Sequence, residues 1–403
     1  MRGKRPDRNR AKRPDRNPTR SGQRQMTPSA EENQVDHRSG PTRRSGFGLV
    51  PFALLLGVLI VLVGGRVPTA GAADESGPSP FFGILAQQPM SEDDFDTMAW
   101  GRLGSYRATI KWESVDRNGD GDMDWGAVDS LVRETAERGI ELLPVFYDTP
   151  SWLAGNRRRL PIFNGYARYH WKTLLREAVD RYGTDGTFWR EHAELPERPI
   201  RYWQVWNEPN IKYWAKPVSV PKYARLLGIS ARVIRNADPN AKVVTAGLYS
   251  RPRNGAGIRA RKFIERLYRQ PGFRRSFDIA AIHPYAGTTR KSVRRTFPIR
   301  EVMDRFGQTG KRLMVTELGW GSDASTSFGT GSLEAQAEQL TSAYRAYLRH
   351  RRELRLKAVY WFSWSDLPPE TVTCSFCRET GLFDVDGRAK PAWQSLLDFT
   401  HDI

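Results

Sequence analysis

The sequence predicts a (β/α)8 TIM barrel, preceded by a basic tail and one apolar segment. Short apolar runs alternate with longer amphipathic stretches, and eight such runs occur over about 320 residues, the count and length of this fold. An open doubly wound sheet is the alternative, but no glycine-rich phosphate loop follows the first run. We expect a single barrel domain over residues 80–403. The expected strands are residues 81–86, 105–111, 141–147, 200–205, 242–247, 277–282, 313–316 and 358–362.

Helices are expected between these strands. Ser91-Glu92-Asp93-Asp94 has the pattern of a capping box at the start of the first helix. The clearest amphipathic stretches further along the chain are residues 125–138, 167–182, 221–236, 258–269 and 332–351.

The first 46 residues differ in composition from the rest of the chain. They hold 13 basic and five acidic residues, a net charge of +8, and few apolar side chains. Such a segment cannot bury enough apolar surface to fold, so we expect a disordered basic tail. This tail supplies a large part of the overall charge of +18. The high charge therefore gives little support to nucleic-acid binding, and attraction of the tail to anionic lipids is the simpler interpretation.

Residues 47–65 are uncharged and long enough to cross a bilayer as a helix. The positive charge before them predicts a cytoplasmic N-terminus, with everything after Arg66 outside. Ala70-Gly71-Ala72 has the small-x-small form of a signal peptidase site. A retained anchor and a cleaved signal peptide are thus both open, and both place the residues after a linker at 66–79 outside the cytoplasm.

The two cysteines, Cys374 and Cys377, are spaced as Cys-x-x-Cys in an expected loop after the last strand. A thioredoxin-like redox motif would need its first cysteine at the start of a helix in a βαβ unit, and these cysteines lie in an expected loop. A zinc site would need four ligands, and no second pair of cysteines or histidines accompanies these two. We expect a local disulfide, as is usual in exported chains.

Two glutamates follow strand-like runs about a hundred residues apart. The strings are Trp206-Asn207-Glu208-Pro209-Asn210 and Thr316-Glu317-Leu318-Gly319-Trp320. In such barrels, reactive groups lie at the C-terminal ends of the strands, where the βα loops meet. Cleavage of a glycosidic bond requires two carboxyl groups, one to protonate the leaving oxygen and one to attack carbon or activate water.

Other strand ends bring further polar and aromatic residues to the same rim. Arg107 lies on the second strand, His283 and Tyr285 follow the sixth, and Trp361 ends the eighth. Tryptophans at positions 152, 320 and 364 are candidates to extend an aromatic platform, although each is equally explained by packing.

These strings resemble those of clan A glycoside hydrolases, the retaining glycosidases that include family 5 cellulases and family 39 xylosidases. The resemblance covers residues 80–400 and implies Glu208 as acid/base and Glu317 as nucleophile, with no cofactor needed for the chemistry. It also implies Asn207 on the sugar 2-hydroxyl and one of His283 and Tyr285 on the nucleophile. The residues expected to contact substrate are Asn207, Arg107, His283, Tyr285, Trp361, Trp152 and Trp320.

Residues 116–124 have the spacing Asp-x-Asn-x-Asp-Gly-x-x-Asp of a calcium loop. The candidate ligands are Asp116, Asn118, Asp120, Asp122 and Asp124. Ala127 stands where a bidentate glutamate is expected. A structural calcium site and an acidic turn that caps the following helix both remain open.

The expected function is a retaining glycosidase that acts on an oligo- or polysaccharide, with the β configuration favoured. Transglycosylation is the alternative within enzymes, and a non-catalytic carbohydrate-binding envelope protein is the alternative of another class. Three arginines at positions 157–159 raise the further hypothesis of an acidic glycan, although solvated surface charge also explains them.

Overall fold

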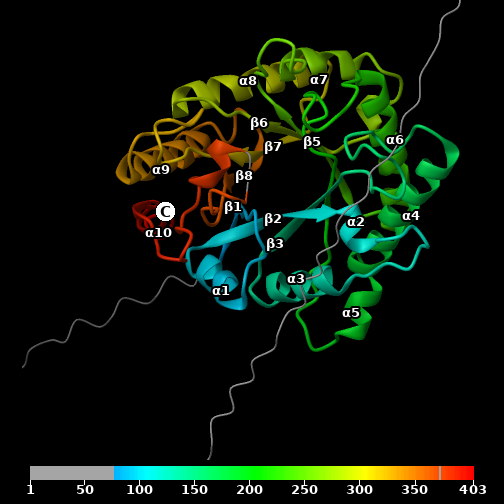
Figure 1. Cartoon of the computed structure of the whole chain (residues 1–403), viewed down its shortest axis with the longest axis horizontal. Coiled ribbons are helices and arrows are strands. Elements are labelled where there is room, and N and C mark those ends of the chain that lie inside the picture. Colours follow the sequence, from blue (N-terminus) through cyan, green and yellow to red (C-terminus); the bar gives the residue numbers. More distant parts are fainter. Residues whose placement is uncertain (1–76, 372–373) are drawn as a thin grey trace, which may run out of the picture. The chain divides into compact units, whose positions relative to one another are not determined.

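The computed structural model describes residues 77–371 and 374–403, and its eight strands close into a parallel barrel in sequence order. Figure 1 shows the strands at the centre and the long helices around them. The prediction of a TIM barrel is confirmed. The strands are β1 Ser79–Leu85, β2 Leu103–Lys111, β3 Glu141–Tyr147, β4 Tyr202–Val205, β5 Lys242–Tyr249, β6 Ile279–His283, β7 Arg312–Leu318 and β8 Leu356–Phe362.

Helices connect successive strands, as the right-handed crossover of parallel neighbours requires. Ser91 and Asp94 form the expected capping box at the start of α1. The α-helices are α1 Glu92–Trp100, α2 Trp112–Val115, α3 Gly126–Glu137, α4 Gly165–Tyr182, α5 Thr187–Glu191, α6 Val220–Ala237, α7 Ala260–Tyr268, α8 Thr289–Arg305, α9 Leu333–Arg349 and α10 Pro391–His401. Two short 3-10 turns are η1 Phe273–Arg275 and η2 Ser375–Arg378.

The interior of the barrel is filled by one small cluster of side chains. Tyr360 is fully buried there, and its hydroxyl lies 2.9 Å from the hydroxyl of Ser105. Gly83 provides the space for this ring, because a Cβ at that position would lie 2.4 Å from a Tyr360 ring carbon. The remaining members of the cluster are Leu143, Val244, Ile279, Ala281, Met314 and Ala358.

Position along a strand decides which side chains reach this interior. On β8 the buried interior residues Ala358 and Tyr360 are two apart, so Phe362 continues the same face. Val359 and Trp361 instead belong to the larger core between the barrel and its helices. The predicted site residue Trp361 therefore faces the helices and not the barrel interior.

The predicted tail and apolar segment, residues 1–46 and 47–65, lie outside the described residues, as does most of the predicted linker. Within residues 77–371 and 374–403, no helix combines the length and apolarity needed to cross a membrane. The anchor and signal-peptide interpretations therefore both stay predictions.

Candidate active site

Glu208 and Glu317 face each other at the C-terminal ends of β4 and β7. A carboxyl oxygen of each, together with a nitrogen of His283, lie within 4.8 Å of one another. Glu208 is 4% exposed, and the Glu317 side chain is 12% exposed. The barrel thus brings together two carboxyl groups that are 109 positions apart in sequence.

The backbone around Glu208 is held in an unusual conformation. Trp206 and Glu208 have φ of 71° and 38°, in the left-handed region that non-glycine residues rarely adopt. Packing holds this turn in place, because the Trp206 indole is fully buried and its N–H donates to the carbonyl of Trp214 at 2.9 Å. The Glu208 amide donates to the carbonyl of Gly247 on β5 at 3.2 Å. The turn directs the carboxyl group over the barrel.

Arg107 on β2 connects both sides of the site. Its guanidinium donates to a Glu317 carboxyl oxygen at 2.8 Å, to the Asn207 side-chain oxygen at 2.8 Å and to the Gln204 side-chain oxygen at 2.7 Å. Arg107 is 3% exposed, so the ion pair with Glu317 is only weakly screened by water. The bond to the Asn207 oxygen leaves the amide N–H2 of Asn207 free to donate to another group.

His283 at the end of β6 lies between the two carboxyl groups. Its Nδ1 is 2.7 Å from Glu208 and 3.2 Å from Glu317, and its Nε2 is 3.0 Å from the Thr316 hydroxyl. Burial, and then the nearby positive charge of Arg107, lower the pKa of His283 well below its ordinary value. The ring is therefore neutral, and Nδ1–H donates to a carboxyl group while Nε2 accepts from Thr316.

Gly247 on β5 makes room for this imidazole. A Cβ at that position would lie 1.9 Å from His283 Nε2 and 2.6 Å from the Thr316 hydroxyl. No larger residue fits unless the histidine moves. The glycine therefore positions the ring between the carboxyl groups.

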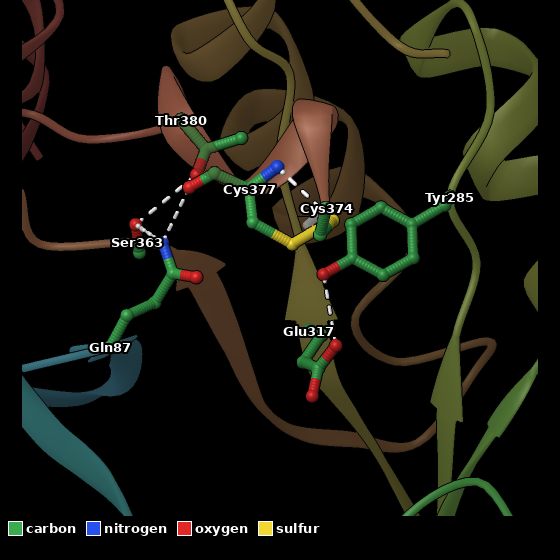
Figure 2. Close-up of a disulfide and its surroundings, with 7 residues drawn as sticks. All are labelled: Gln87, Tyr285, Glu317, Ser363, Cys374, Cys377 and Thr380. Atoms are coloured by element: carbon green, nitrogen blue, oxygen red, sulfur yellow. Dashed lines mark hydrogen bonds between the residues drawn. A yellow bond between two sulfur atoms is a disulfide. The ribbon is translucent and has the colours of Figure 1, made fainter. Parts of the chain in front are cut away.

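Tyr285 follows β6 and contacts the second glutamate. Figure 2 shows the Tyr285 hydroxyl directed at Glu317, to which it donates at 2.9 Å. Burial, and next the charge of Glu317, raise the pKa of Tyr285 well above its ordinary value, so the hydroxyl remains a donor. Its ring packs on Phe328 and Phe376, with centroids 5.6 and 5.2 Å away.

The two carboxyl groups differ in how easily they ionise. Burial, and next the negative charge of Glu317, raise the pKa of Glu208 well above its ordinary value. Burial raises the pKa of Glu317 too, but Arg107 and the Tyr285 hydroxyl oppose that rise. Two close carboxyl groups in a dry site cannot both ionise readily. Glu317 therefore loses its proton first, while Glu208 keeps its own.

Metal ligands need several donor atoms that converge on one point. Among the described residues, one group of three His, Cys, Asp or Glu side chains meets this condition, and it consists of Glu208, His283 and Glu317. The guanidinium of Arg107 already pairs with Glu317, and its charge would repel a cation. The donor set fits an acid and a nucleophile better than it fits a metal.

Two of the predicted platform residues are buried in the core between the barrel and its helices. Trp361 and Trp320 are each 1% exposed and pack on one another, with ring centroids 6.0 Å apart. The Trp361 N–H donates to the carbonyl of Thr380 at 3.0 Å. This burial speaks against the stacking role predicted for both. The half-buried Phe362, one position further along β8, continues the interior face and lies 6.3 Å from the Tyr285 ring.

Trp152 is held against the acidic loop after β2. Its N–H donates to the carbonyl of Asp116 at 2.8 Å, and its ring lies 5.7 Å from that of Trp112. Gly119 leaves space for the ring, since a Cβ there would lie 2.5 Å from it. These contacts explain Trp152 by packing.

The carboxylates of residues 116–124 do not converge on a common point among the described residues. Asp120 accepts from the side-chain amide of Asn118 at 2.6 Å, and Asp124 pairs with Arg117 at 3.1 Å. Asp124 also accepts from the amide of Gly126, the first residue of α3, at 3.2 Å. This geometry favours the acidic turn over the calcium loop, since donors already occupy carboxylate oxygens of Asp120 and Asp124 that a cation would need.

Cys374 and Cys377 form the expected local disulfide, which Figure 2 shows beside Tyr285 and Glu317. Gln87, after β1, donates to the carbonyl of Cys377 at 2.7 Å. The disulfide encloses Phe376, which packs on Tyr285. The loop thereby supports the tyrosine that contacts Glu317.

Sequence reasoning missed three residues that contact the site. Gln204 links Arg107 to the carbonyl of Thr245, and Thr316 supports His283. A hydrogen bond from the Trp214 side chain opposes the rise of the Glu208 pKa. Gln204 could have been found from the sequence, because it is a polar residue among the apolar residues of β4. A buried polar side chain needs a hydrogen-bond partner, which marks it as a candidate for a site network.

Comparison with solved structures gives many matches of similar quality. A family 39 glycoside hydrolase from Bacteroides cellulosilyticus has a TM-score of 0.61 at 18% identity, over 80% of this chain and 63% of that one. A family 5 (subfamily 18) enzyme from Streptomyces cattleya, solved with Manβ1-4GlcNAc, has a TM-score of 0.60 at 15% identity, over 79% and 80%. This chain shares the TIM-barrel fold of these solved glycoside hydrolases.

A monomeric β-xylosidase from Caulobacter crescentus is also similar, with a TM-score of 0.56 at 20% identity, over 81% of this chain and 69% of that one. No family model and no curated protein matches the sequence. At these identities the resemblance stated from the sequence is confirmed for the fold, and the activity must be argued from the site.

Proposed function

We propose that this protein is a retaining glycoside hydrolase that cleaves O-glycosidic bonds by double displacement. The observation that carries the proposal is the buried pair Glu208 and Glu317, with oxygens within 4.8 Å. Retaining enzymes hold their carboxyl groups about 5–5.5 Å apart, whereas inverting enzymes need about 6.5–9.5 Å to admit water. The short separation supports direct attack by a carboxylate.

In the first step, Glu317 attacks the anomeric carbon while Glu208 gives its proton to the departing glycosidic oxygen. The ionic states support this assignment, because Arg107 and Tyr285 stabilise the carboxylate of Glu317 and burial keeps Glu208 protonated. A covalent glycosyl-enzyme results, and the aglycone leaves with the proton.

In the second step, Glu208 removes a proton from water, which attacks the anomeric carbon and releases Glu317. A sugar hydroxyl in place of water would give transglycosylation by the same residues. The Asn207 amide, whose oxygen is held by Arg107, is placed to donate to the sugar 2-hydroxyl. That bond strengthens as charge develops in the transition state.

The test is hydrolysis of a panel of aryl β-glycosides by the full-length protein and its variants. Glu208→Gln and Glu317→Gln should each reduce turnover at least about 1000-fold, because each removes a group required in one or both steps. Glu338→Gln, on the exposed surface of α9, is the matched control. NMR of the first-formed product should show retained configuration. Inverted product, or full turnover in both site variants, would refute the mechanism.

We also propose that the catalytic domain acts outside the cytoplasm. The apolar segment at residues 47–65, the positive charge before it and the disulfide of the domain support this localisation. Immunoblots of membrane, medium and cytosol fractions test it. Detection in the cytosol alone would contradict the proposal.

A further inference from the structure

The charges on the catalytic rim are distributed unequally between its two halves. Four loops follow β3, β4, β5 and β6, and together they hold eight lysines and arginines and, besides Glu208, one carboxylate, Asp148. The four connections after β7, β8, β1 and β2, the last counted through the short α2 as far as Trp125, hold 11 carboxylates and four basic residues. The catalytic residues Glu208 and Glu317 come from opposite halves. One side of the rim is therefore cationic.

Asp148 does not neutralise this side, since it is already paired. Its carboxylate accepts from Arg157 at 2.8 Å. The Arg157 guanidinium also lies over the rings of Tyr213 and Trp214, 5.8 and 5.5 Å from their centroids. The arginine first suspected from the sequence thus has a local partner, and the uncompensated charge lies elsewhere.

That charge gathers around Tyr249, at the end of β5. Arg251 and Arg253 follow in the β5 loop, and Arg295 reaches over from the second turn of α8 to donate to the carbonyl of Tyr285. None of the three arginines forms an ion pair with a carboxylate among the described residues. The ring of Tyr249 lies 6.2 Å from that of Tyr285, which contacts Glu317. Arg295 therefore lies beside a residue that contacts Glu317, and Arg251 and Arg253 lie two and four positions after Tyr249 in the β5 loop.

The electrostatics agree with this placement. Burial, and next the like charge of Arg251, lower the pKa of Arg295. The residues from Leu248 to Arg300 contain two carboxylates, Glu265 and Asp278. Both are engaged elsewhere: Asp278 precedes β6, at the far end of the barrel from the rim, and pairs with Arg235, while Glu265 on α7 pairs with Arg305. Like charges held together without a counter-ion favour the binding of an anion.

We propose that the substrate is an anionic glycan, and that Arg251, Arg253 and Arg295 bind its negatively charged groups beside the cleavage point. This inference rests on the proposed function and specifies its substrate class. Guanidinium groups bind carboxylates and sulfates alike, in a bidentate manner. The chemistry recognised is thus an acidic substituent on a sugar next to the scissile bond.

Binding to the full-length Glu208→Gln protein, measured by calorimetry, tests the proposal without dependence on turnover. Three oligosaccharides of equal length serve as probes: a polyuronate, a sulfated glycan and a neutral glycan. We expect an anionic probe to bind at least about tenfold more tightly than the neutral one at low salt, and to weaken as salt is added. The two anionic probes distinguish carboxylate from sulfate recognition.

The variant Arg251→Ala/Arg253→Ala in the same background should lose about tenfold or more in affinity for the anionic probe and little for the neutral probe. Arg225→Ala/Arg232→Ala removes the same charge from the exposed face of α6 and is the matched control, expected to change affinity less than about twofold. Equal losses in the two variants, or equal binding of neutral and anionic probes, would overturn the proposal. Hydrolysis of neutral aryl glycosides by the unmodified protein reports separately on the proposed function.

Discussion

The hydrogen bond from Tyr285 to Glu317 offers a sharp test of how the nucleophile is kept ionised. Tyr285→Phe removes the hydroxyl that donates to the carboxylate at 2.9 Å and keeps the ring that packs on Phe328 and Phe376. The change therefore alters one polar contact and leaves the aromatic packing in place.

The magnitude follows from the charge of the acceptor. A hydrogen bond to a charged group contributes about 1.5–3 kcal/mol, and one pKa unit corresponds to about 1.4 kcal/mol. The bond lowers the pKa of Glu317, so its loss should raise that pKa. Because the ionised carboxylate is the nucleophile, the acidic limb of the pH profile should move to higher pH.

The assay is the pH dependence of kcat/KM for an activated aryl glycoside. At acidic pH the variant should lose about 10- to 150-fold in kcat/KM, and part of that loss should be recovered as the pH rises. Tyr249→Phe is the control for losing a tyrosine hydroxyl nearby, since the Tyr249 ring is 6.2 Å from that of Tyr285. An acidic limb that stays in place would refute the reasoning, as would an equal shift in the control.

Three further predictions concern stability. Because the pKa of Glu208 is raised in the folded protein, the folded state loses stability relative to the unfolded chain as the pH rises from 4.5 towards that raised pKa. The gain in melting temperature of Glu208→Gln over the unmodified protein should therefore grow as the pH rises through this range. A difference in melting temperature that does not change with pH would contradict this prediction. Gly83→Ala should destabilise by about 1–3 kcal/mol in urea, because the new methyl meets the Tyr360 ring, whereas Gly310→Ala, with open space around it, should be nearly neutral. The disulfide between Cys374 and Cys377 closes only a short loop, so its reduction should lower the free energy of unfolding by no more than about 2 kcal/mol in a denaturant titration. A larger loss would mean that the disulfide supports more than its own loop.

Much of the fold follows from local pattern. Alternating apolar runs and amphipathic stretches located the strands to within a few residues, and the capping box at Ser91 and Asp94 was readable because it involves residues three apart. The glutamates were found for a similar reason. Strand ends in a closed barrel meet at one rim, so Glu208 and Glu317 had to lie on the same face once the barrel was predicted.

The roles of the aromatic residues depended on strand register. Trp361 and Phe362 are adjacent, and a shift of one position exchanges the barrel interior for the helix-facing core. A continuous apolar run, typical of a strand buried on both faces, carries no mark of which residue faces inward. At the end of β8 the sequence prediction named Trp361, whose side chain packs in the helix-facing core, whereas the next residue, Phe362, continues the interior face.

The amino-acid sequence by itself determined the barrel, the catalytic candidates and the local disulfide, since each is written in short patterns of residue type and spacing. Tertiary structure alone decided the network that joins Arg107, Gln204, His283 and Thr316, and the arginine cluster beside Tyr249. These contacts join strands that are up to about two hundred residues apart in the sequence. A local sequence pattern does not show which of these distant side chains will become hydrogen-bond partners when the barrel closes.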